Sequence, residues 1–118
     1  MPRPKKSRMV CSLPRNTGFL PVNGCGGQGK IILTVDEYEA IRLIDKEGFS
    51  QEQCGEYMEI ARTTVQQIYT SARRKIADSL VEGRPLWIEG GQYILCGQRE
   101  RENCCKNCPK CGREKLKA

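Results

Sequence analysis

Residues 50–76 have the sequence SQEQCGEYMEIARTTVQQIYTSARRKI, and the clearest structural signals of the chain lie here. Ser50 and Gln53 form a capping box that opens a short helix reaching about Met58. After a turn of a few residues, a longer helix begins near Arg62. Its apolar residues recur on one side at helical spacing: Val65, Ile68, Ala72, Ile76 and Leu80. A short capped helix, a turn and a longer helix are the pattern of a helix-turn-helix.

The sequence on either side of this stretch predicts one more helix and a pair of strands. Thr34 and Glu37 form a second capping box, which opens a helix that ends at Gly48. After the long helix, two apolar runs within residues 86–95 flank Gly90 and Gly91, which suits a β-hairpin with a tight turn.

The expected fold is therefore mainly α. It has a three-helix helix-turn-helix domain with a short β-hairpin over residues 33–95. A basic arm rich in Gly and Pro is expected over residues 1–32, and a basic, Cys-rich tail over residues 96–118.

The outward side of the long helix carries side chains that suit DNA. With the apolar stripe facing inward, stepping about 100° per residue places four side chains on the opposite side: Thr63, Gln67, Thr70 and Arg74. Three more lie on its flanks: Arg62, Thr64 and Gln66. Arg, Thr and Gln can match the hydrogen-bonding edges of base pairs.

A basic run follows one to two turns later. Arg73, Arg74 and Lys75 suit contacts to phosphates, which fix position rather than sequence. The alternative is that the polar face is only solvated and that the basic run complements the helix dipole.

Residues 59–76 resemble the recognition helix of region 4 in bacterial sigma factors. The shared features are the R-x-x-V-x-Q-I core and the later A-R-R-K-I. The resemblance implies that Arg62, Thr63 and Gln67 read bases. Thr63 stands where the sigma helix usually has Glu, so the preferred DNA sequence should differ. Ala61 replaces the usual Ser or Thr cap, which weakens the helix start.

A wider resemblance covers about residues 1–95. The chain is similar to a prokaryotic family called uncharacterised protein family zero-two-five-one. The matching segments are Arg3 to Val10, Leu33 to Leu43, Ser71 to Gly83 and Ile88 to Gly91. The resemblance implies a DNA-binding helix-turn-helix.

The overall charge also favours an anionic partner. The chain has 20 Lys and Arg against 14 Asp and Glu, a net charge of +6. The first thirty residues hold six of these bases and no acid. Arg3, Lys5, Lys6 and Arg8 could therefore reach DNA phosphates or a minor groove, or could form a solvated terminus.

Several functional classes are not expected. No apolar run approaches the roughly 18 residues of a membrane span. The chain has no His and no recognisable cofactor loop, so we expect a protein that is not an enzyme. Nothing near residue 1 resembles a secretory signal, which favours a cytoplasmic location.

The tail is the densest chemical signal. Five Cys residues there could bind metal: Cys96, Cys104, Cys105, Cys108 and Cys111. Structural zinc is the first expectation. An iron–sulfur cluster and a redox-sensitive thiol pair are the alternatives. Cys54 is expected to be a small buried hydrophobic residue instead.

The sequence thus predicts a regulator that binds double-stranded DNA, with a metal-binding or redox-sensitive tail. The alternative is an interaction module that docks on RNA polymerase or another protein through the sigma-like domain. A dimer is compatible with either prediction.

Overall fold

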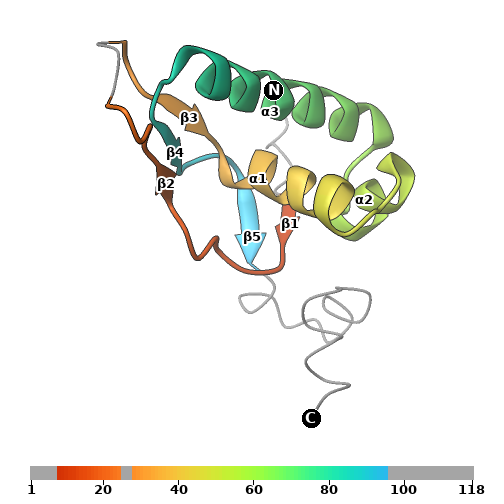
Figure 1. The fold of residues 1–118 in the computed structure, drawn as a ribbon. Helices are drawn as coiled ribbons and strands as arrows, with labels where there is room; N and C mark the ends of the chain where they lie inside the picture. Colours follow the sequence, from red (N-terminus) through yellow and green to blue (C-terminus); the bar gives the residue numbers. More distant parts are fainter. Residues whose placement is uncertain (1–7, 25–27, 96–118) are drawn as a thin grey trace, which may run out of the picture.

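The computed structural model describes residues 8–24 and 28–95. Its three helices are α1 (Val35–Ile41), α2 (Gln51–Met58) and α3 (Arg62–Glu82), and α1 continues into one π-helical turn, η1 (Arg42–Lys46). Five short strands accompany them: β1 (Arg8–Val10), β2 (Gly18–Phe19), β3 (Ile31–Leu33), β4 (Leu86–Ile88) and β5 (Tyr93–Leu95). The helices pack together, and the strands gather along one side of them (Figure 1). The predicted three helices are confirmed.

Local hydrogen bonds start the first two helices. The Thr34 hydroxyl accepts from the Glu37 amide at 3.4 Å, and the Glu37 carboxylate accepts from the Thr34 amide at 2.9 Å. Ser50 and Gln53 make the same reciprocal pair at 3.0 and 2.9 Å. Both predicted capping boxes are therefore present. At the start of α3, Ala61 supplies no side-chain cap, so tertiary packing must hold that end.

The turn between α2 and α3 is tight. Glu59 adopts a left-handed conformation with φ of 62°, and the Ile60 amide donates to the Gly55 carbonyl at 3.0 Å. A Cβ atom at Gly55 would lie 2.9 Å from the Ile60 carbonyl oxygen and 3.4 Å from Val65 Cγ2. Gly55 therefore allows the turn and α3 to pack closely against α2.

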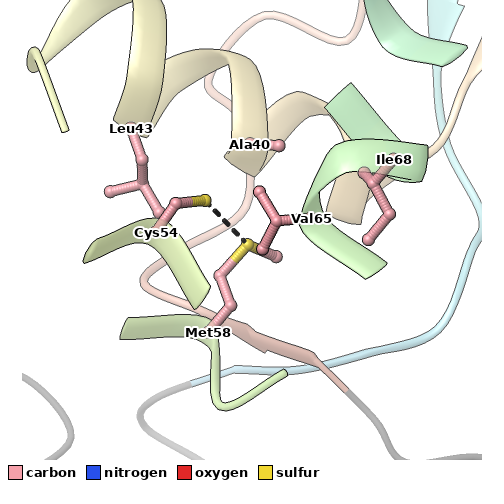
Figure 2. Close-up of a cluster of buried hydrophobic side chains, with 6 residues drawn as sticks. All are labelled: Ala40, Leu43, Cys54, Met58, Val65 and Ile68. Atoms are coloured by element: carbon pink, nitrogen blue, oxygen red, sulfur yellow. Dashed lines mark hydrogen bonds between the residues drawn. The ribbon is translucent and has the colours of Figure 1, made fainter. Parts of the chain in front are cut away.

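One hydrophobic cluster joins the three helices. Its members are Ala40, Leu43, Cys54, Met58, Val65 and Ile68 (Figure 2). The Cys54 thiol lies inside it, with Sγ 3.7 Å from Met58 Sδ. Burial, and then the nearby Glu39 carboxylate, raise the pKa of Cys54 to about 12. The prediction that Cys54 is a small buried hydrophobic residue is confirmed.

A second cluster lies between the helices and the strands. It contains Ile31, Leu33, Ala72, Leu86 and Ile88, with Tyr38, Ile41 and Ile76 packed against it. The predicted apolar stripe of α3 is therefore correct from Val65 to Ile76. It is wrong for Leu80, which is 80% exposed because the last turns of α3 extend beyond this cluster.

The predicted β-hairpin is wrong. Strand β4 pairs with β2 in antiparallel fashion and with β3 in parallel, whereas β5 pairs in parallel with β1 in a separate sheet. The Gly90 carbonyl accepts from the Val35 amide at 3.0 Å, and a Cβ atom at Gly91 would lie 2.5 Å from Asp36 Oδ1. The glycine pair therefore carries the chain past the start of α1 into the second sheet instead of turning it back.

Candidate nucleic-acid interface

The outward side of α3 carries exposed polar side chains from Thr63 to Arg74. The opposite side of the helix is buried in the two hydrophobic clusters through Val65, Ile68 and Ala72. On the outward side a shallow depression of about 640 Å³ is lined by Thr63, Gln66, Gln67, Thr70, Ser71 and Arg74. The structure thus brings together most of the side chains that the sequence predicted for base contacts. Arg62 is exposed at the first turn, and Thr64 is half-buried.

The segment formed by α1 and η1 lies on the inner side of α3 and places an acid on each flank, Glu37 from α1 and Asp45 from η1. On one flank Glu37, which is buried, receives Lys75 Nζ at 2.7 Å and the Ser71 hydroxyl at 2.7 Å. Lys75 is therefore an anchor between α1 and α3, and its ammonium group is already matched by a carboxylate.

The environment of Glu37 favours its charged form. Burial raises its pKa, but hydrogen bonds from Lys75, Ser71 and the Thr34 amide, together with the charge of Lys75, outweigh burial. The net pKa lies below the ordinary value of 4.5. The Glu37 carboxylate thus caps α1 and holds α3 as an anion.

On the other flank Asp45 engages Arg73. The Tyr69 hydroxyl donates to Asp45 Oδ1 at 2.7 Å and accepts from Arg73 Nη1 at 3.1 Å. Arg73 Nε lies 3.9 Å from Asp45 Oδ2, and its guanidinium carbon lies 5.4 Å from the centre of the Tyr69 ring. These contacts are exposed, so they orient Arg73 more than they stabilise the fold.

Arg74 differs from both of its neighbours. It is exposed in the depression, and no ion pair joins it to any residue in the described ranges. The basic run therefore divides into Lys75, which α1 engages, Arg73, which η1 engages, and Arg74, which faces outward. The sequence alone predicts all three as equivalent phosphate ligands, because Glu37 and Asp45 are distant in the chain and give no local signal.

The N-terminal basic residues are only partly described. Arg8 lies in β1 and pairs with the buried Asp36 at 3.4 Å. Arg3, Lys5 and Lys6 lie outside the described residues.

The five tail cysteines also fall outside the described residues, so the zinc and iron–sulfur expectations stay predictions: Cys96, Cys104, Cys105, Cys108 and Cys111. Within residues 8–24 and 28–95, no group of three or more His, Cys, Asp and Glu side chains could hold a metal ion. Cys11, which is described, is buried, and its amide donates to Glu39 Oε2 at 3.1 Å.

None of the described helices is both long and apolar enough to cross a membrane.

Comparison with known proteins identifies the family of the chain. The family model described as "Protein of unknown function DUF134" matches residues 1–96. A UPF0251 protein of Desulfitobacterium hafniense strain Y51 is 58% identical over 97 residues, which cover 81% of this chain and 78% of the relative. A UPF0251 protein of Caldanaerobacter subterraneus subsp. tengcongensis is 49% identical over 102 residues, or 86% of each chain. No solved structure gives a significant match. The chain therefore belongs to the UPF0251 family, and residues 1–96 match the family model described as DUF134.

Proposed function

We propose that this protein binds double-stranded DNA in a sequence-specific manner and regulates transcription. In this proposal α2, the turn over residues 59–61 and α3 form a helix-turn-helix, and α3 enters the major groove. The observation that carries the proposal is the outward side of α3. Its base-matching side chains and the unneutralised Arg74 share one depression, while α1 and η1 engage the neighbouring cations.

The chemistry of this surface favours particular bases. A Gln side chain can donate to and accept from the edge of adenine, and a Thr methyl group can contact the methyl group of thymine. Gln66, Gln67 and Thr70 are the central exposed residues of the surface, and no acid lines the depression to accept from cytosine. The proposed half-site is therefore rich in A·T pairs, with Arg62 placed at the helix start to contact a guanine.

Packing supports this role, because a reading surface must be held rigidly. The buried Val65 and Ile68 fix the inner side of the first turns of α3, and the Lys75–Glu37 pair fixes the helix further along. In contrast, the exposed side of α2 carries Glu52 and Glu56, which would repel phosphates. The approach of DNA is thereby directed to α3.

The test is selection of binding sites from random DNA with the full chain purified anaerobically, with and without a chelator. We expect one enriched motif containing A·T pairs. A motif lost on chelation would make the Cys-rich tail a metal-dependent part of the regulator. No enriched motif in either condition would overturn the proposal and would favour docking on a protein such as RNA polymerase.

A pair of variants separates base contacts from phosphate contacts. Gln67→Ala should lower affinity for the selected motif by about tenfold while leaving affinity for random DNA unchanged. Arg74→Ala should instead weaken binding to both. Equal loss on all DNA with Gln67→Ala would contradict its base-reading role.

A further inference from the structure

The two flanks of α3 hold their cations in different ways. On one flank the Lys75 ammonium group lies 2.7 Å from the buried Glu37 carboxylate. On the other flank Arg73 Nε lies 3.9 Å from Asp45 Oδ2, too far for a hydrogen bond, and the two side chains are 63% and 39% exposed. The hydrogen bond of Arg73 goes instead to the uncharged Tyr69 hydroxyl, at 3.1 Å. The pair of Arg73 and Asp45 is therefore loose and open to water.

We propose that Asp45 competes with DNA for Arg73. In the DNA-free protein the Asp45 carboxylate faces the Arg73 guanidinium group, and a backbone phosphate takes its place when α3 enters the major groove. This inference rests on the proposed function and adds regulation of the same surface. An acid of η1 sets how tightly α3 holds DNA of any sequence.

The position of Arg73 on the helix argues for a phosphate as the ligand. An α-helix with its side chains is about 10–12 Å across and the major groove is about 12 Å wide, so the flanks of a helix in the groove lie beside the sugar–phosphate backbones. Arg73 lies about 100° around the helix from Arg74, which lines the outward depression. Gln66, which also lines the depression, lies about two turns before Arg73 on the same flank. Arg73 is thus at the edge of the reading surface, where a phosphate would pass.

Tyr69 prepares Arg73 for this exchange. The Tyr69 hydroxyl accepts from Arg73 Nη1, and the guanidinium carbon lies 5.4 Å from the centre of the Tyr69 ring. These two contacts do not involve Asp45, so they still orient the guanidinium group after a phosphate has replaced the carboxylate. A guanidinium group can bind a phosphate through two N–H donors at once. The phosphate therefore gains hydrogen bonds that Asp45, at 3.9 Å, does not make.

Binding of the full chain to two duplexes, one with the selected motif and one of random sequence, tests the competition. Asp45→Asn removes the charge and keeps an oxygen that can accept from Tyr69. It should tighten binding to both duplexes by about fivefold and steepen the slope of log affinity against log salt by about one. The matched control is Glu89→Gln, which removes the charge of an exposed acid just after β4 and should change affinity by less than about twofold. Unchanged affinity in Asp45→Asn, or an equal gain in both variants, overturns the inference.

A double-mutant cycle shows whether the gain depends on Arg73. In an Arg73→Ala background, Asp45→Asn should tighten binding by less than about twofold, which is the part due to net charge alone. A gain as large as in the otherwise unchanged chain would mean that Asp45 repels DNA independently of Arg73, and the competition would be wrong. Circular dichroism should be the same for all variants, because the pair is exposed.

The same measurements separate this inference from the proposed function. If site selection enriches no motif but Asp45→Asn tightens binding through Arg73, sequence-specific reading is overturned and the competition stands. If the wild type prefers the selected motif and Asp45→Asn binds both duplexes as the wild type does, only the competition is overturned. If neither protein binds any duplex, both proposals are overturned.

Discussion

Arg74 and Lys75 follow one another in the chain, yet the structure gives them different surroundings. The Lys75 ammonium group lies 2.7 Å from the buried Glu37 carboxylate, whereas Arg74 lines the outward depression of α3. The difference between them is about 100° of rotation around the helix. It shows that the position of a cation relative to α1, rather than its residue type, decides whether it stabilises the fold or is available to a ligand.

The pair that Lys75 forms with Glu37 is tested most strongly by removing the Glu37 carboxylate. Glu37→Ala should lower the free energy of unfolding by about 3 kcal/mol, because it removes a cap and leaves Lys75 without its partner. Urea unfolding measures the loss. Glu52→Ala, which removes an exposed acid of α2, is the matched control and should change stability by less than about 0.5 kcal/mol. Similar losses in both variants would contradict a special role for Glu37.

Removing Lys75 and removing Arg74 should have opposite effects on stability and on DNA affinity. Lys75→Ala should lower the free energy of unfolding by about 1.5 kcal/mol and change DNA affinity by less than about twofold. Arg74→Ala should leave stability unchanged and weaken binding to all DNA by about tenfold, with the slope of log affinity against log salt reduced by about one. Unfolding curves and a salt titration give both readouts. If both variants changed stability and DNA affinity equally, the distinction between Lys75 as a structural residue and Arg74 as a DNA contact would be wrong.

The pH dependence of stability sharpens the comparison. The pKa of Glu37 in the folded protein lies below its ordinary value of 4.5, so the folded state binds this proton less readily than the unfolded state. Its contribution is therefore fully present above the unfolded pKa and is lost as pH falls through the folded pKa. Lys75→Met should make this loss shallower in unfolding curves between about pH 3 and pH 6. Parallel curves for the two proteins would show that Lys75 does not lower this pKa.

The smallest effect on stability is expected at Tyr69, whose hydroxyl joins Asp45 to Arg73. Tyr69→Phe removes an exposed hydrogen bond to Asp45 and should cost about 0.5 kcal/mol. Because Arg73 is then held less firmly, DNA affinity should not fall. A clear loss of affinity would show that the bonded orientation of Arg73 contributes to binding.

The features that sequence analysis predicted correctly are those with local signals. Thr34 and Ser50 each form a capping box with the residue three positions later, which marks the start of a helix. The buried apolar residues from Val65 to Ala72 recur at helical spacing. The repeat itself does not show where the core ends, so the prediction that Leu80 belongs to the core is wrong.

The strand pairings had no comparable signal. Gly90 and Gly91 have the composition of a hairpin turn, but β4 and β5 each find partners near the other end of the chain. The same limit applies to the site. The exposed polar residues of α3 follow from its period, whereas the pairing of Lys75 with Glu37 depends on how α1 crosses α3.

The strand order has a consequence for biosynthesis. Strands β1, β2 and β3 are made first, but each pairs with β4 or β5, which follow all three helices. A nascent chain that has reached Gly83 can form its helices, but Ile31 and Leu33 still lack Leu86 and Ile88, their partners in the second cluster. Non-local pairings of this kind close late. The apolar side chains of the N-terminal strands therefore stay uncovered until residues 86–95, the last ten residues that the structure describes, have been made.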